Sequence, residues 1–316
     1  MDSNRNGVQR LFNSYEEIEE PIPFAHNDPT YGLDSEELVK SVKMGANRLR
    51  YLLANGRFQS RGMKLTEEIL MKVPNHALSW EYRKECLLLK QFRICFESEM
   101  TFCKNILLAD PRNNYAWGQR RFCIEHTLEF GYRGELEFLD EVYRRHPECQ
   151  LLWTYRFWLT SRFNLFSWEI NQTSLRISEA ANNKNVWWYR GKLILISRYP
   201  LEEEEEFILE ALRANPTSEA IWNHINEFFD SAKLYSTKLK ETCLAIMENN
   251  RMHRQAVTAL VFNELRGDPQ QIDRFLVSQM VDILKEKLDT KKKVFWSYFQ
   301  DNCCGQNFQG TQAIRL

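Results

Sequence analysis

The sequence contains few of the residues that form tight turns. It has 12 glycines and 9 prolines among 316 residues, whereas a sandwich or barrel of short strands needs a turn about every ten residues. An all-β fold is therefore disfavoured. With 43% hydrophobic and 27% charged residues, the chain has the composition of a folded protein with a large core. We expect that core to be built from helices.

Long apolar runs are also missing. No run approaches the roughly 18 residues that a helix needs to span a bilayer. The segment from Met1 to Gln9 lacks the apolar stretch of a secretion signal. We therefore expect no membrane insertion and a cytoplasmic location.

The charges show no excess of one sign. Lys and Arg number 42 against 43 Asp and Glu, for a formal net charge of -1, so long-range attraction to nucleic acid is not expected. The cysteines form no C-x-x-C pair, so we predict neither a disulfide framework nor a metal site on this chain, and expect most of them to be small buried side chains. They are Cys86, Cys95, Cys103, Cys123, Cys149, Cys243, Cys303 and Cys304.

The sequence does contain a repeat built on tryptophan. Five tryptophans follow one another at separations of 37, 36, 34 and 35 residues, a period typical of a solenoid of helical hairpins. They are Trp80, Trp117, Trp153, Trp187 and Trp222. Six residues before them stand Pro74, Pro111, Pro147, Ala181 and Pro216, and three residues after them stand Arg83, Arg120, Arg156, Arg190 and Ile225.

The proline of each repeat predicts a break between two helices, because it disfavours helix in the preceding residue and is tolerated in a first helical turn. Apolar residues at spacings of three and four precede it, as in Leu136, Leu139 and Val142. Neither helix can bury its apolar face alone, so successive hairpins must stack. We predict an all-α fold, a right-handed α-α superhelix that is a solenoid of tetratricopeptide-like hairpins.

The repeat also predicts the organisation of the chain. Residues 1–33 form an extended or disordered N-terminal arm, and residues 34–300 form the superhelical solenoid. Within it, five repeats occupy about 58–232 and capping helices occupy 233–300. Residues 301–316 form a flexible tail.

Two roles are open for the tryptophan and arginine of each repeat, which share one helix face. They pack between helices with a salt bridge to the next repeat, or they form a ladder of cations where a partner or an anionic ligand docks. The asparagines before the tryptophans suit helix caps. We interpret the acidic run from Glu202 to Glu206 as a solvated helix start, and the cluster from Lys291 to Lys293 as an exposed helix turn.

These repeats resemble those of the protein prenyltransferase α subunits, in particular the subunit shared by protein farnesyltransferase and geranylgeranyltransferase type I. That family repeats a Pro/Asn-x-Asn-Tyr-x-x-Trp-x-x-Arg unit, to which the segment from Pro111 to Arg120 is similar. The arm from Tyr15 to Pro23 and the segment from Asp289 to Tyr298 are similar to the family's flanks. The resemblance covers about residues 15–300.

The resemblance implies a heterodimer in which this chain embraces and stabilises a β subunit that holds a catalytic zinc ion and the lipid pocket. Zinc on that subunit would activate the cysteine of a C-terminal CaaX box for attack on farnesyl or geranylgeranyl diphosphate, and magnesium would accompany the diphosphate. This chain would be inactive alone and would carry no metal.

The family's α subunit supplies a lysine five residues before the third-repeat tryptophan, but this chain has Glu148 there. The family's tyrosine two residues later is Gln150. A carboxylate beside a departing diphosphate opposes the build-up of charge, so we assign no catalytic residue. Arg112 and Lys184 are candidate replacements on the diphosphate side. Alternatively, the β subunit supplies all of the charge, or the complex has lost or altered its activity.

The resemblance also assigns residues of the repeat motif to the interface with the partner. These are Trp80, Arg83, Asn114, Tyr115, Trp117, Arg120, Trp153, Arg156, Asn183, Trp187, Arg190 and Trp222. Two alternatives remain open. One is a non-catalytic tetratricopeptide-like scaffold that binds protein partners, and the other is a Rab geranylgeranyltransferase α subunit, against which the motif from Pro21 to Pro23 counts.

Overall fold

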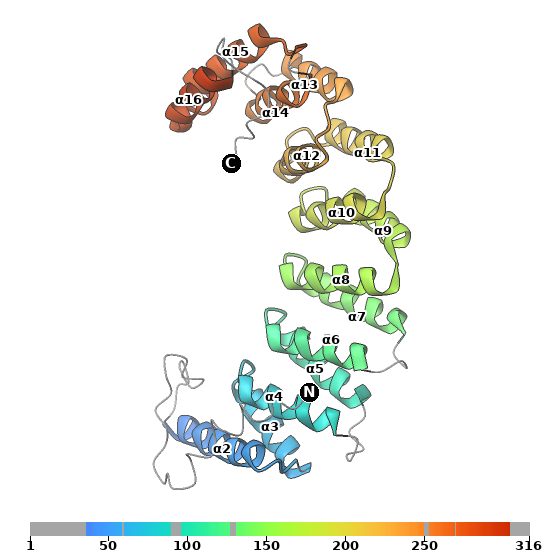
Figure 1. The fold of residues 1–316 in the computed structure, drawn as a ribbon, viewed down its shortest axis with the longest axis vertical. Coiled ribbons are helices and arrows are strands. Elements are labelled where there is room, and N and C mark those ends of the chain that lie inside the picture. Colours follow the sequence, from blue (N-terminus) through green and yellow to red (C-terminus); the bar gives the residue numbers. More distant parts are fainter. Residues whose placement is uncertain are drawn as a thin grey trace. The chain divides into compact units, whose positions relative to one another are not determined.

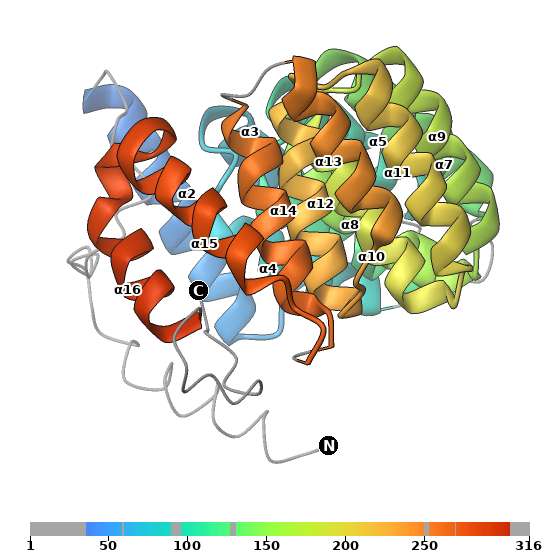
Figure 2. The same ribbon diagram turned by 90° about the horizontal axis from the view of Figure 1, so that it is seen from above.

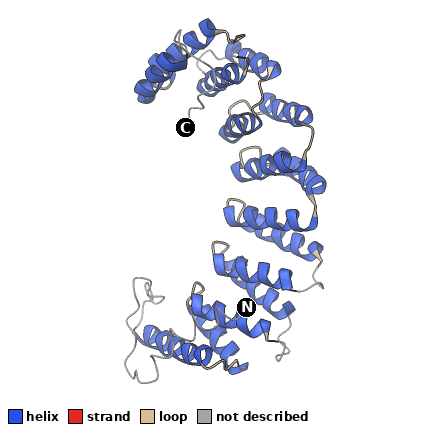
Figure 3. Cartoon of the chain, viewed as in Figure 1, coloured by secondary structure: helices blue, strands red, loops and turns tan. Residues whose placement is uncertain are grey.

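The computed structural model describes residues 36–58, 60–89, 96–126, 131–249, 253–268 and 270–303. All regular secondary structure in these ranges is helical (Figure 3), which confirms the predicted all-α fold. The predicted N-terminal arm lies outside the described residues, as does the predicted tail except for residues 301–303, which end the last helix. The chain divides into two compact units, Met1–Arg156 and Phe157–Leu316.

The first unit consists of consecutive antiparallel helices (Figure 1). They are α2 (Glu36–Ala54), α3 (Ser60–Lys72), α4 (Ala77–Leu88), α5 (Phe96–Ala109), α6 (Asn114–His126), α7 (Tyr132–Arg145) and the first half of α8 (Gln150–Phe163). The repeat signature predicts all of these except α2, which packs against both α3 and α4.

The second unit continues the pattern from the second half of α8. Its helices are α9 (Phe166–Glu179), α10 (Lys184–Ser197), α11 (Leu201–Ala214), α12 (Glu219–Ala232), α13 (Thr237–Asn249), α14 (Arg254–Arg266), α15 (Arg274–Ile283) and α16 (Lys293–Cys303). A π-helical turn (Leu284–Leu288) and a 3₁₀ turn (Thr290–Lys292) link the last two. Figure 2 shows α11, α12, α13 and α14 side by side in this unit. Helices α13 to α16 follow the last copy of the tryptophan signature.

The proline of the repeat stands two residues after the end of the first helix. Thus α5 ends at Ala109 and precedes Pro111, and α7 ends at Arg145 and precedes Pro147. Proline is common there because it cannot continue a helix. Each of these prolines therefore lies in the loop between the two helices of its hairpin.

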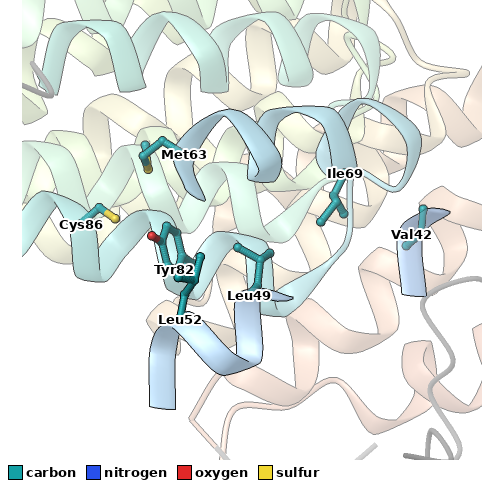
Figure 4. Close-up of a cluster of buried hydrophobic side chains, with 7 residues drawn as sticks. All are labelled: Val42, Leu49, Leu52, Met63, Ile69, Tyr82 and Cys86. Atoms are coloured by element: carbon teal, nitrogen blue, oxygen red, sulfur yellow. The ribbon is translucent and has the colours of Figure 1, made fainter. Parts of the chain in front are cut away.

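The core of the first hairpin is an apolar cluster shared with α2 (Figure 4). Tyr82 of α4 is fully buried beside Leu49 and Leu52 of α2 and Met63 of α3. Helix α3 comes so close that a methyl group on Gly62 would lie 2.1 Å from the Tyr82 hydroxyl oxygen. The structure therefore requires glycine at position 62. No helix in the described ranges is both long and apolar enough to cross a membrane.

Candidate functional site

A hydrogen bond from the repeat tryptophan closes the loop between the two helices of its hairpin. The indole Nε1 donates to the backbone carbonyl oxygen six residues earlier. The distances are 2.8 Å for Trp80 to Pro74, 2.9 Å for Trp117 to Pro111, 2.9 Å for Trp187 to Ala181 and 2.7 Å for Trp222 to Pro216. Because the acceptor is a backbone oxygen, the alanine of the fourth repeat serves as well as proline. The constant spacing of six residues is the loop length that this bond requires.

The arginine of the repeat joins its own hairpin to the next one. Arg83 of α4 donates from Nε and Nη2 to the Glu99 carboxylate of α5, at 2.9 Å and 2.6 Å, and from Nη1 to Oγ1 of Thr66 on α3, at 3.0 Å. Burial alone would lower the pKa of Arg83, but the bonds to Glu99 raise it above its ordinary value. Such a two-pronged pair fixes orientation as well as distance.

The same bridge recurs twice more. Arg120 of α6 donates from Nε to Glu135 of α7 at 2.8 Å and from Nη1 to the Met100 carbonyl of α5 at 2.6 Å. Arg190 of α10 donates from Nε and Nη2 to Glu204 of α11 at 2.8 Å and 2.6 Å. Its Nη1 also donates to α9, to the Ile170 carbonyl and the Thr173 and Ser174 hydroxyls.

The carboxylates of these bridges occupy one position, the fourth residue of each first helix. Across the repeats that position holds Met63, Glu99, Glu135, Glu169 and Glu204, and in α13 it holds Lys240. The four glutamates are buried. Lys240 follows the repeat in which Ile225 replaces the arginine, so the cation and the carboxylate disappear together. This is expected because either charge left alone in the core would be costly.

In three of these bridges between hairpins, an aromatic ring also packs against the arginine. A phenylalanine three residues after the glutamate stacks under the guanidinium, with Arg carbon to ring centre distances of 4.0 Å for Phe102, 3.9 Å for Phe138 and 3.9 Å for Phe207. The same rings lie 5.9, 5.8 and 5.9 Å from the rings of Trp80, Trp117 and Trp187. The Glu-x-x-Phe of one hairpin thus packs on the Trp-x-x-Arg of the hairpin before it.

In three repeats the residue two positions after the tryptophan lies against the bridge of the preceding repeat. Gln119 donates to Glu99 at 3.0 Å and Tyr155 donates to Glu135 at 2.8 Å. His224 occupies the same position in the fifth repeat, where its Nε2 lies 3.9 Å from Glu204. Burial lowers the pKa of His224 to about 3, with help from the Arg190 charge. His224 is therefore neutral at pH 7.

These contacts decide between the two roles of the tryptophan and arginine pair. The packing interpretation, with a salt bridge to the next repeat, is confirmed at Arg83, Arg120 and Arg190. Arg156 is also buried, and bonds to Asp140 of its own hairpin at 2.7 Å. The alternative, a ladder of cations open to a ligand, is wrong for these arginines because they are at most 3% exposed. The solvated role expected for the acidic run is wrong at Glu204, which is fully buried.

The remaining candidates lie at the N-terminal ends of the second helices. Asn183 is buried and caps α10, accepting from the Asn185 N–H at 3.0 Å. The candidate residues exposed at these helix starts are Arg112, Asn114, Tyr115, Glu148, Gln150 and Lys184. Arg112, Asn114, Tyr115, Glu148 and Gln150 belong to the first unit and Lys184 to the second. These side chains lie at the surface of the described part of the chain.

A groove brings three of the predicted interface residues together in the first unit. It has a volume of about 580 Å³ and lies between α4 and α6. Trp80, Asn114 and Tyr115 line it, with Glu81 and Lys84 on the α4 side. Tyr115 is 43% exposed. The groove therefore offers an aromatic ring, an amide and charges of both signs to a partner chain.

Cys149 occupies a position that a better capping residue fills elsewhere. In the other repeats this position, four residues before the tryptophan, holds His76, Asn113, Asn183 and Ser218, each the N-cap of the second helix. The Cys149 thiol donates to the Pro111 carbonyl at 3.3 Å. We predict that Cys149→Ser stabilises the chain by about 0.5–1 kcal/mol, because serine is a favoured cap and its hydroxyl donates more strongly. Urea unfolding would measure this, with Cys243→Ser, a buried cysteine within α13, as the control expected to destabilise.

The residues that the structure describes do not fit a metal ion. Within the described ranges, no three His, Cys, Asp or Glu side chains gather where they could hold one. Five cysteines whose side chains the structure describes are free thiols, and four of these five are buried. No step of a reaction can therefore be derived through a metal bound to these residues.

Two segments of the chain match a known family of repeats. Residues 96–127 and 132–163 match the family described as the protein prenyltransferase alpha subunit repeat. These two segments have the sequence of prenyltransferase α-subunit repeats. The matched segments correspond to the hairpins α5–α6 and α7–α8. The tryptophan bond described above recurs outside these segments, in α3–α4, α9–α10 and α11–α12.

The fold is also that of a solved prenyltransferase structure. The chain is similar to a structure titled Candida albicans protein geranylgeranyltransferase-I complexed with GGPP, with a TM-score of 0.72 and 21% identity over 90% of this chain and 94% of that chain. No curated protein sequence matches the chain. At this identity the structural likeness shows the fold alone, an all-α solenoid.

Proposed function

We propose that this protein is the α subunit of a heterodimeric protein prenyltransferase. The complex transfers a farnesyl or geranylgeranyl group from its diphosphate to the cysteine of a C-terminal CaaX box. This chain embraces and stabilises a β subunit, is inactive alone and works in the cytoplasm. The observation that carries the proposal is the family match of the repeats over residues 96–163, supported by a fold similarity that spans nearly the whole chain.

The chemistry is divided between the two subunits in this proposal. The β subunit holds zinc, which supplies the thiolate of the substrate cysteine, and magnesium accompanies the diphosphate. The residues described here contribute shape and surface charge. Arg112 and Lys184, exposed at the starts of α6 and α10, are the cations of this chain that would face the diphosphate. Glu148 is the exposed carboxylate that would oppose it.

The test is transfer by the assembled complex. The chain is co-expressed with each β-type subunit of its own organism, and transfer of labelled farnesyl or geranylgeranyl to CaaX peptides is measured. The proposal predicts transfer by at least one pair and none by either subunit alone. If complexes form but transfer neither lipid, the transferase role fails. If no β chain binds, the alternative of a non-catalytic scaffold gains.

The Glu148→Lys variant tests the one position that departs from the family pattern by a reversal of charge. A cation in place of the carboxylate stabilises the charge that builds on the departing diphosphate, so we predict a turnover about tenfold higher or more. Single-turnover assays of the complex measure this rate. Glu210→Lys, the same substitution on the exposed face of α11, controls for the change in net charge. Equal rates in wild type and Glu148→Lys would remove Glu148 from the chemistry.

A further inference from the structure

One position of the repeat has a second bond besides its helix cap. Asn113 of the second repeat accepts the Ala116 N–H at 2.9 Å through Oδ1 and donates from Nδ2 to the Pro74 carbonyl at 2.8 Å. Ser218 of the fifth repeat accepts the Ile221 N–H at 3.5 Å and donates to the Ala181 carbonyl at 3.3 Å. The Cys149 thiol donates to the Pro111 carbonyl in the same way. Each acceptor lies in the loop of the preceding repeat.

The acceptor is the carbonyl that already receives the tryptophan bond. Pro74 accepts from both Trp80 and Asn113, each at 2.8 Å, and Ala181 accepts from both Trp187 and Ser218. A carbonyl oxygen has two lone pairs, and here both are used. One bond closes a hairpin and the other fastens the next hairpin's loop to it.

The residue before this position is exposed in every repeat. Asn113 is 0% exposed, whereas Arg112 beside it is open to solvent. The same loop is also held at its N-terminal side, because the Arg112 backbone N–H donates to the Asp110 side chain at Oδ1, at 3.0 Å. Glu148 and Thr217 are likewise the exposed neighbours of Cys149 and Ser218. The residue that bonds to the preceding loop therefore fixes the backbone from which its exposed neighbour projects.

We infer that the residue four before the tryptophan in the second, third and fifth repeats is a positioning residue, which sets the spacing of neighbouring loops and so the placement of the exposed side chain that precedes it. Asn113 places Arg112, and Cys149 places Glu148. The functional meaning of these exposed positions rests on the proposed prenyltransferase role. The hydrogen bond to the preceding loop does not depend on that role.

Two substitutions separate the inter-repeat bond from the helix cap. Asn113→Asp keeps an acceptor for the Ala116 N–H but turns a carboxylate toward the Pro74 carbonyl, so the donor is lost. Asn113→Ser keeps both bonds, as Ser218 does in the fifth repeat. The Trp80 indole and Asn113 share the Pro74 oxygen as acceptor. Hydrogen exchange of the Trp80 indole N–H in the full chain, followed by NMR, therefore reports whether the contact between the two loops is intact. We expect exchange about tenfold faster in Asn113→Asp and within about twofold of wild type in Asn113→Ser.

Asn171→Asp, the same substitution at an exposed position of α9, controls for the added charge. Should Asn113→Asp fail to fold, Ser218→Asp makes the same change at a second junction, with the Trp187 indole as the reporter. Equal indole exchange in the Asp and Ser variants of Asn113, or an unchanged Trp187 indole in Ser218→Asp, would overturn the inference.

A second readout tests the placement of Arg112 in the assembled complex. Asn113→Asp should lower kcat/KM for the prenyl diphosphate about fivefold, and should lower it no further when Arg112→Ala is already present. Fully additive losses would contradict a role exerted through Arg112. If the wild-type complex transfers no prenyl group, the proposed function is contradicted. The indole exchange measurement would still test the positioning role, because it needs no transfer activity.

Discussion

Replacement of Arg190 by methionine is expected to cost about 3–5 kcal/mol of unfolding free energy, because it leaves the Glu204 carboxylate buried without its cation. Glu204 is fully buried, and burial already raises its pKa against the lowering effect of its bonds to Arg190. The difference in unfolding free energy between wild type and variant should therefore be smaller at low pH, where Glu204 can be protonated. Urea unfolding of the full chain at pH 7 and pH 5 would measure both effects.

Two further variants make this result specific. The double variant Arg190→Met with Glu204→Met should recover most of the loss, since two apolar side chains can replace a buried pair. Arg213→Met removes the arginine of an exposed pair, 3.4 Å from Glu206, and should cost much less stability than Arg190→Met, because an exposed ion pair contributes little. If the double variant is no more stable than the single one, the bridge is not the reason for the loss.

Acid should destabilise the second unit through His224. Its pKa is about 3 in the folded protein and about 6.5 in an unfolded chain. Below pH 6.5 the unfolded state therefore binds a proton that the folded state does not. The stability that neutral His224 confers is present above pH 6.5 and is lost as the pH falls toward 3. The loss amounts to about 3 kcal/mol between pH 7 and pH 4.

His224→Gln removes this titration while retaining a neutral polar side chain. The difference between wild type and variant in unfolding free energy should shift in favour of the variant as the pH falls from 7 to 4. Asn171→Gln, at an exposed position of α9, is the control, because it changes no titratable group and should leave the pH profile unchanged. Parallel profiles for wild type and His224→Gln would show that His224 does not titrate in this way.

The hairpins could be predicted from the sequence because their signals are local. Pro111 ends one helix and Trp117 lies on the next, and the bond between them closes within six residues, so a constant spacing records it. The capping helices follow from ordinary amphipathic spacing. Helix α2 carries no copy of the signature, since its role is to cover the outer side of the first hairpin, and the repeat could not predict it.

The salt bridges could not be assigned in the same way, because each joins two repeats. The separation between arginine and glutamate shrinks from Arg83–Glu99 through Arg120–Glu135 to Arg190–Glu204 as the intervening loops vary. No fixed spacing therefore marks the partner. A usable signal was the glutamate at the fourth position of α5, α7 and α11, followed in each of them three residues later by phenylalanine.

The candidate site was only partly predictable for a related reason. Asn113 and Asn114 are adjacent in the motif, but the structure buries the first as a cap and exposes the second. Sequence spacing alone does not decide which of two neighbours faces the loop of the preceding repeat. The exposed set of Arg112, Tyr115 and Glu148 emerges only once the caps are placed.

The most direct test of the proposed heterodimer is the mass of the assembly that this chain forms when co-expressed with a β-type prenyltransferase subunit. Native mass spectrometry should find a stable complex with one copy of each chain, and the exposed Asn114 and Tyr115 should become protected from hydrogen exchange in it. A chain that remains without a β partner under these conditions would contradict the proposed role.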